Sequence, residues 1–152
     1  MVTIEDLYST LIREGVRRNL DVVAEFCVAP RNRLFEKKID LAWVRRREDA
    51  NRFGSLRRWQ IVAAFEIEGY DVPLDRLELH TSQIKQLWEE ERECFPCFVP
   101  LYTRAFHRTN PDWGNDKPER KIRQRVEEAR RLGGVVDVRD GRDMSWLDAV
   151  AR

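Results

Sequence analysis

The run RWQIVAAFEIE at residues 58–68 constrains the fold of this chain most, because it is apolar along most of its length and ends in two carboxylates. Its aromatic and β-branched residues are typical of a strand, and Gly69 closes the run. The period of two along a strand places Glu66 and Glu68 on the same face, about 6.5 Å apart. We therefore expect a buried strand that carries a pair of acids at its end.

The run KIDLAWV at residues 38–44 has the same property, because Asp40 interrupts an otherwise apolar strand. Only a loop separates the two runs, so they can form a hairpin in which Asp40 faces Glu66. Buried carboxylates need a cation, a hydrogen-bond network or water. Hard oxygen ligands suit Mg²⁺ or Mn²⁺, which can polarise a phosphate and generate a hydroxide nucleophile. The remaining carboxylate, Glu68, can orient or deprotonate that water.

The rest of the chain predicts one α/β domain, since 152 residues with 42% apolar content suffice for a single core. A capping box at Thr3 and Asp6 indicates that a helix begins there. Pro100 cannot donate to a ladder, which suggests an edge or a break in its strand. Helices are expected at 3–18, 73 to about 92, 119–132 and in the last residues, and strands at 22–28, 38–44, 58–68, 97–103 and 135–138.

This order of elements, with KKIDLAWV and VAAFEIE as second and third strands, resembles the αβββαβ core of the PD-(D/E)XK, or restriction-endonuclease-like, nuclease superfamily. The resemblance covers roughly residues 3–103 and implies a central mixed sheet flanked by helices. Residues 104–152 would then be a C-terminal helix-strand-helix extension. In that superfamily the acids of the second and third strands bind the metal, which maps to Asp40 and Glu66. Many members add a glutamate from the first helix, for which Glu14 and Glu5 are the candidates.

One residue departs from the superfamily pattern, because Glu68 stands where the third strand usually carries a lysine. Some restriction endonucleases of the superfamily have Glu there and still cleave. Lys85 on the following helix is the candidate for the missing cation, and Gln83 is a candidate for contacting substrate or the attacking water. The resemblance thus implies a Mg²⁺- or Mn²⁺-dependent endonuclease that hydrolyses phosphodiester bonds in DNA. The alternative is a non-catalytic nucleic-acid-binding or assembly module with a degenerate nuclease fold.

Two groups of basic residues are candidates for binding phosphates, although the net charge is only +1. The first flanks the loop between the second and third strands, and the second lies at the start of the 119–132 helix. They are Arg45, Arg46, Arg47, Arg57 and Arg58, followed by Lys117, Arg120 and Lys121. A solvated loop explains the first group equally well, and a surface helix with Glu119/Arg123 and Glu127/Arg131 pairs is the favoured explanation of the second.

Other patterns place the protein in a reducing, cytoplasmic compartment. The chain has no leader-like start and no apolar run of about 20 residues, so a membrane is not expected as a partner. Its three cysteines are an odd number in a chain large enough to have a core. Cys94-x-x-Cys97 has no second pair, which disfavours a zinc site. A homodimer or a larger complex is compatible with the sequence, which does not fix the assembly.

Overall fold

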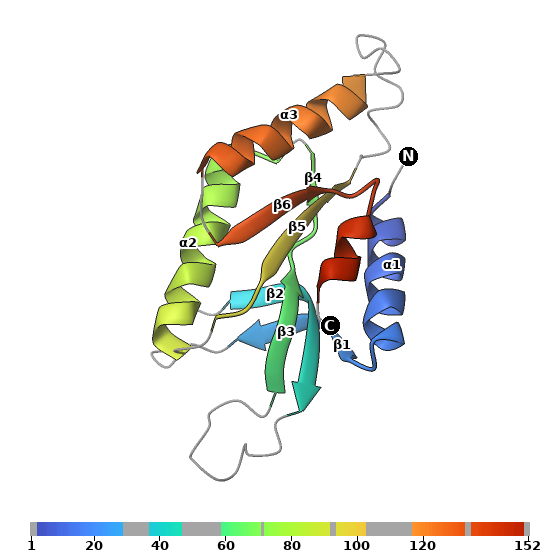
Figure 1. The fold of residues 1–152 in the computed structure, drawn as a ribbon. Helices are drawn as coiled ribbons and strands as arrows, with labels where there is room; N and C mark the ends of the chain where they lie inside the picture. Colours follow the sequence, from blue (N-terminus) through green and yellow to red (C-terminus); the bar gives the residue numbers. More distant parts are fainter. Residues whose placement is uncertain are drawn as a thin grey trace.

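The computed structural model describes residues 3–28, 37–46, 59–70, 72–91, 94–102, 117–132 and 135–150. These residues form an α/β fold, as predicted (Figure 1). No described helix combines the length and the apolar character that crossing a membrane requires. The elements are α1 (Ile4–Arg17), β1 (Asp21–Val28), β2 (Lys37–Arg46), β3 (Trp59–Phe65), β4 (Glu68–Gly69), α2 (Leu74–Glu91), β5 (Cys97–Tyr102), α3 (Lys117–Leu132), β6 (Val136–Asp140) and the 3-10 helix η2 (Ser145–Ala149).

The six strands form one mixed sheet in the order β1-β2-β3-β5-β4, with β6 also pairing β5. The strands β1, β2 and β3 are an antiparallel meander, whereas β3, β4 and β6 all run parallel to β5. Parallel neighbours require a crossover, and α2 and α3 supply the two that lead into β5 and β6. The expected mixed sheet with helices on its faces is therefore confirmed.

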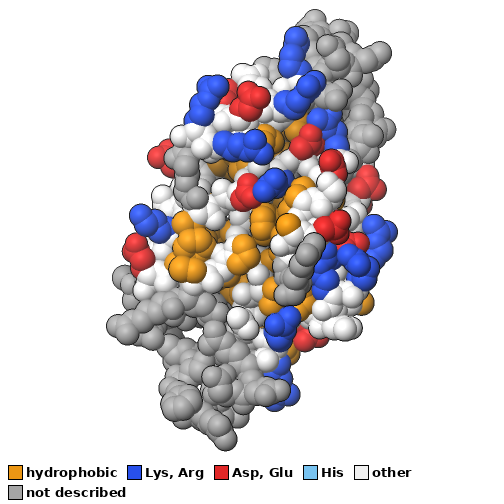
Figure 2. Space-filling view, viewed as in Figure 1, with side chains coloured by type: hydrophobic (Ala, Val, Ile, Leu, Met, Phe, Trp, Pro, Cys, Tyr) orange, Lys and Arg blue, Asp and Glu red, His pale blue; other side chains and the backbone are white. Residues whose placement is uncertain are grey.

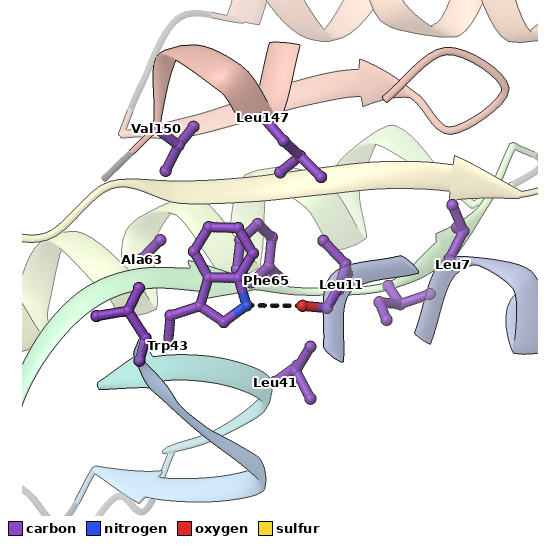
Figure 3. Close-up of a cluster of buried hydrophobic side chains, with 10 residues drawn as sticks. Leu7, Leu11, Leu41, Trp43, Ala63, Phe65, Leu147 and Val150 are labelled. Atoms are coloured by element: carbon purple, nitrogen blue, oxygen red, sulfur yellow. Dashed lines mark hydrogen bonds between the residues drawn. The ribbon is translucent and has the colours of Figure 1, made fainter. Parts of the chain in front are cut away.

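The core lies on both faces of this sheet. One face packs against α1 and η2, and Figure 3 shows this cluster around Trp43. The other face packs against α2 and α3. Buried residues of the α1 face are Leu7, Leu11, Leu20, Leu41, Trp43, Ala63, Phe65, Ile67, Leu147 and Val150. Those of the opposite face include Ile39, Ala42, Val44, Ile61, Ala64, Ile84, Phe95 and Cys97 near α2, and Leu77, Val99, Leu101, Ile122, Val126 and Val138 near α3.

The helix α1 lies very close to the sheet. Its start is the predicted capping box, in which Thr3 and Asp6 exchange side-chain to main-chain hydrogen bonds. Farther along, the indole Nε1 of Trp43 donates to the carbonyl oxygen of Leu11 over 2.9 Å (Figure 3). A Cβ atom on Gly15 would lie 2.5 Å from Cγ2 of Val22, so only glycine permits this approach. The contact fixes the distance between helix and sheet.

The strand predicted at 58–68 is divided in two, which corrects the prediction of a continuous run. The pairing with β5 keeps one register on both sides of the gap at Glu66 and Ile67, from Phe65↔Phe98 to Glu68↔Leu101. Pro100 lies opposite this gap. It has no N–H to donate to the Glu66 carbonyl, which a regular parallel ladder would require. The break that Pro100 suggested therefore lies between β3 and β4. The strand β5, which contains Pro100, is continuous and has partners on both sides, so it is not an edge.

Candidate active site

The strands β2 and β3 separate beside two acids, Asp40 of β2 and Glu66, which directly follows β3. Their pairing begins at Leu41↔Phe65, and before Leu41 the strand β2 continues beside β1 alone. After Phe65 the chain instead follows β5 as β4. The main-chain N–H of Ile67 donates to Oδ2 of Asp40 over 2.9 Å. We call this divergence of β2 from the Glu66–Ile67 segment the fork, and Asp40 ties its two sides together.

Glu25 of β1 lies beside Asp40 on the neighbouring strand. The register runs from Ala24↔Leu41 to Phe26↔Ile39, which places Glu25 opposite Asp40. Its φ of 50° is in the left-handed region, which non-glycine residues rarely adopt and which costs about 1–3 kcal/mol. Strained backbone of this kind concentrates at functional sites, so the position warrants a functional hypothesis. Glu25, Asp40 and Glu66 together are called the acidic row below.

The strained residue also reverses the alternation of side chains in β1. Val23 and Phe26 are three residues apart, yet both pack against the α2 side of the sheet. Ile39 and Ala42 of β2 repeat this spacing. Residues on one face of a regular strand are two apart, so both strands carry an irregularity at the level of Glu25 and Asp40. The acidic row therefore coincides with a local distortion of two adjacent strands.

The acidic row influences the pKa of one phenol, that of Tyr8. Tyr8 of α1 is partly buried against the Trp43 cluster. Burial raises the pKa of Tyr8, and the charges of Asp40, Glu66 and Glu25 and the nearby Tyr102 raise it further. These three carboxylates come from three strand segments and act on one hydroxyl group. Glu66 is only 3% exposed, so its charge acts in a poorly solvated environment.

Glu68 is held by α2. Its carboxylate is 3.4 Å from Nη2 of Arg76 and 3.8 Å from Nδ1 of His80. Both partners lie in the first half of α2, and the Glu68 side chain is 8% exposed. The predicted role of Glu68, binding metal or orienting the attacking water, stays a prediction. The structure assigns its side chain a contact with this helix.

Glu14 lies away from the acidic row. Its carboxylate accepts hydrogen bonds from Arg17 and Arg18, at 2.9 and 2.5 Å, at the C-terminal end of α1. These hydrogen bonds, that of Arg17 first, lower the pKa of Glu14. Six residues separate it from Tyr8, or roughly 9 Å of helix. The structure thus places this candidate metal ligand in an ion-pair cluster, and Glu5 is exposed in the first turn.

The other predicted residues are spread over the surface. Lys85 is exposed and Gln83 half-buried on α2, and no hydrogen bond or ion pair joins either to Asp40 or Glu66 in the described part of the chain. Arg45 and Arg46 are exposed at the far end of β2, roughly 17–20 Å along the strand from Asp40. Arg120 is exposed on α3. Arg47, Arg57 and Arg58 and the side chains of Lys117 and Lys121 lie outside the described residues.

The acids of the fork can be compared with the ligands that metal ions require. Within the described ranges no three or more His, Cys, Asp or Glu side chains form a group that could hold a metal ion. Mg²⁺ does not need such a cage, because one or two carboxylates bind it together with water and substrate phosphates. Asp40 and Glu66 supply two carboxylates of this kind. Asp40 and Glu66 are therefore the two acids of the fork that could hold such a cation.

Comparisons add no relative to this description. The sequence matches no protein-family model, and no curated protein or solved structure is significantly similar to the chain. The site must therefore be interpreted from its own residues. Sequence reasoning did not assign Glu25, Tyr8 or Tyr102 to the site. The available signal was Glu25, a single acid in the apolar run VVAEFCV.

Proposed function

We propose that this protein is a Mg²⁺- or Mn²⁺-dependent nuclease that hydrolyses phosphodiester bonds in DNA at the fork. The observation that carries the proposal is the hydrogen bond from the Ile67 N–H to Asp40, which ties Asp40 to the segment that contains Glu66 where β2 and β3 diverge. The helix-strand-strand-strand-helix-strand order of the first six larger elements, β4 apart, agrees with a restriction-endonuclease-like core. A PD-(D/E)XK relationship and a cytoplasmic location belong to the same proposal.

The acidic row explains why a cation would be required. Three carboxylates acting on one site repel a phosphodiester, so an anionic substrate can approach only after their charge is balanced. Asp40 and Glu66 would hold the cation, and the Ile67 amide fixes Oδ2 of Asp40 and so orients the whole carboxylate. When bound, Mg²⁺ or Mn²⁺ supplies polarisation of a phosphate oxygen and a more acidic water. Glu25, which lies opposite Asp40 in the strand register, would accept a proton.

The test is cleavage of plasmid and single-stranded DNA with Mg²⁺ or Mn²⁺. Asp40→Asn and Glu66→Gln remove the charges but keep an oxygen acceptor and the side-chain volume, so both proteins should fold. We expect both to lose metal-dependent cleavage. Glu14→Gln is the matched control, because Glu14 is an acid paired with Arg17 and Arg18. Cleavage that survives Asp40→Asn, or that is lost equally in Glu14→Gln, would contradict the assignment.

A second candidate is a non-catalytic nucleic-acid-binding or assembly module, and the engagement of Glu68 favours it. The position that usually supplies a catalytic lysine here carries an anion that forms an ion pair with Arg76 and lies 3.8 Å from Nδ1 of His80. Such a module would bind oligonucleotides without metal and would not take up Mn²⁺ through Asp40. Measuring Mn²⁺ binding to the wild type and to Asp40→Asn therefore separates the two functions. Absence of cleavage with either metal would favour the binding module.

A further inference from the structure

The strand β6 forms one border of the sheet. Among the described residues it pairs only with β5, by Cys97↔Val136 through Leu101↔Asp140. In Figure 1 the strand lies at the front of the sheet, and Figure 2 shows hydrophobic side chains beside charged ones on this side of the molecule. An uncovered border strand presents main-chain N–H and C=O groups that can pair with another chain. What could pair there depends on the side chains that flank these groups.

Two opposite charges alternate with a buried valine along β6. Asp137 and Arg139 lie on the η2 face, where Oδ2 of Asp137 is 2.9 Å from Nη2 of Arg139. The Arg139 guanidinium also lies 5.8 Å from the ring centroid of Trp146 in η2. Val138 points to the opposite face and is buried against the α3 cluster. The side chain of Asp137 is 41% exposed and that of Arg139 is 36% exposed, so both charges are accessible to a partner.

We propose that β6 pairs antiparallel with β6 of a second copy of this chain, around a twofold axis at Val138, so that the sheet continues through both protomers. A twofold axis perpendicular to the sheet keeps each face on its own side. In this register Asp137 of one copy lies opposite Arg139 of the other, and the pair occurs twice. Opposite charges directly across two antiparallel strands are stabilising.

The charge pattern selects this register over its neighbours. A shift of the twofold axis by one residue to Asp137 places Asp137 opposite its own copy, and a shift to Arg139 places two arginines opposite each other. Like charges directly opposite are destabilising. Only the axis at Val138 satisfies the charges of both chains. A partner strand of unrelated sequence would lack this self-complementarity, which is why a second copy is the occupant that β6 fits.

Apolar groups beside β6 can extend the contact beyond the main chain. Val135 and Val136 precede and begin the strand, and both are partly exposed. Trp146 is partly exposed next to Arg139. Stable interfaces bury about 1,200–2,000 Å² in total, more than a five-residue strand supplies by itself. The flanking apolar side chains are where the remaining area would come from. This inference is independent of the proposed nuclease activity.

The experiment is sedimentation velocity of the full chain over a range of concentrations. We expect the wild type to move from the 18.1 kDa monomer to a species of twice that mass. Arg139→Asp and Asp137→Arg each turn both cross-strand pairs into like charges. Each should raise the dissociation constant roughly 10- to 100-fold. Arg125→Asp is the matched control, because it reverses an arginine of the Arg125–Glu128 ion pair on α3.

Two further samples separate charge pairing from damage to the fold. The double variant Asp137→Arg with Arg139→Asp exchanges the two charges and should dimerise like the wild type. An equimolar mixture of the two single variants should form a heterodimer about as tightly as the wild type dimerises, although each variant alone associates more weakly. Circular dichroism checks that every variant folds. A monomeric wild type at all concentrations would overturn the proposal, as would a dimer that the single reversals leave intact or a double variant that fails to associate.

Discussion

Replacing Asp40 tests whether the fork depends on one carboxylate. Its Oδ2 accepts the main-chain N–H of Ile67, a residue that is 7% exposed. Asp40→Ala leaves this amide without its acceptor in a place that water reaches poorly. Hydrogen bonds to charged groups contribute about 1.5–3 kcal/mol, and losing repulsion from Glu25 and Glu66 offsets part of that loss. We therefore expect Asp40→Ala to lower the free energy of unfolding by about 1–2 kcal/mol.

The matched variant is Asp40→Asn, whose Oδ1 can still accept from the Ile67 amide. It should be within about 0.5 kcal/mol of the wild type, because it keeps the hydrogen bond and removes only the charge. Asp75→Ala controls for an exposed aspartate that accepts the main-chain N–H of its neighbour. Urea unfolding at neutral pH gives the free energies of the wild type and the three variants, and the slope of free energy against urea concentration should be the same for all four.

Amide hydrogen exchange localises the effect of Asp40. The Ile67 amide should exchange faster in Asp40→Ala and stay protected in Asp40→Asn, while amides in the centre of β5 change with global stability alone. The reasoning would be refuted by an Asp40→Ala protein as stable as Asp40→Asn, with an Ile67 amide equally protected in both. Such a result would mean that the fork is held by packing and not by this bond.

Two further predictions concern the neighbours of Asp40. Glu25→Gly relieves the left-handed strain and should raise the free energy of unfolding by about 1 kcal/mol over Glu25→Ala, which keeps the strain; equal stability in urea would contradict this. Burial and the charges of the acidic row raise the pKa of Tyr8 above its ordinary 10.0, so the folded state holds this proton more tightly than the unfolded state. The resulting stabilisation is complete below about pH 10 and is lost as pH rises through the folded-state pKa, and Tyr8→Phe should flatten this part of a stability–pH curve.

The larger elements were predictable because each carries a local signal. The capping box at Thr3 and the helical period of α1 need no tertiary information. The break between β3 and β4 could not be predicted from its own residues, since the run FEIE is uninterrupted. Its cause lies in Pro100, which is 34 positions after Glu66 and becomes its neighbour only when β5 pairs with β3. A sequence pattern describes one strand by itself, whereas the hydrogen bonds of a sheet depend on the residues of both paired strands.

The candidate site was predictable in part for the same reason. Acids that interrupt apolar strands stand out in a sequence, which is how Asp40 and Glu66 were identified. Which further acid lies near Asp40 and Glu66 depends on how β1 pairs with β2. Glu25 lies opposite Asp40 in the strand register, whereas Glu14 lies six residues beyond Tyr8 on α1 and accepts hydrogen bonds from Arg17 and Arg18. A single sequence does not tell which residues of neighbouring strands lie opposite each other.

The fork results from three local features that act together. Pro100 removes a donor from one side of the Glu66–Ile67 segment, and Asp40 supplies a side-chain acceptor on the other side. Glu25 takes a left-handed conformation in the same row, which reverses the alternation of β1 beside Asp40. Each feature alone would weaken a sheet without benefit to packing. Their coincidence at three carboxylates argues that the sheet is distorted there to build a charged site, because a sheet selected for stability alone would place apolar residues and regular pairing in this row.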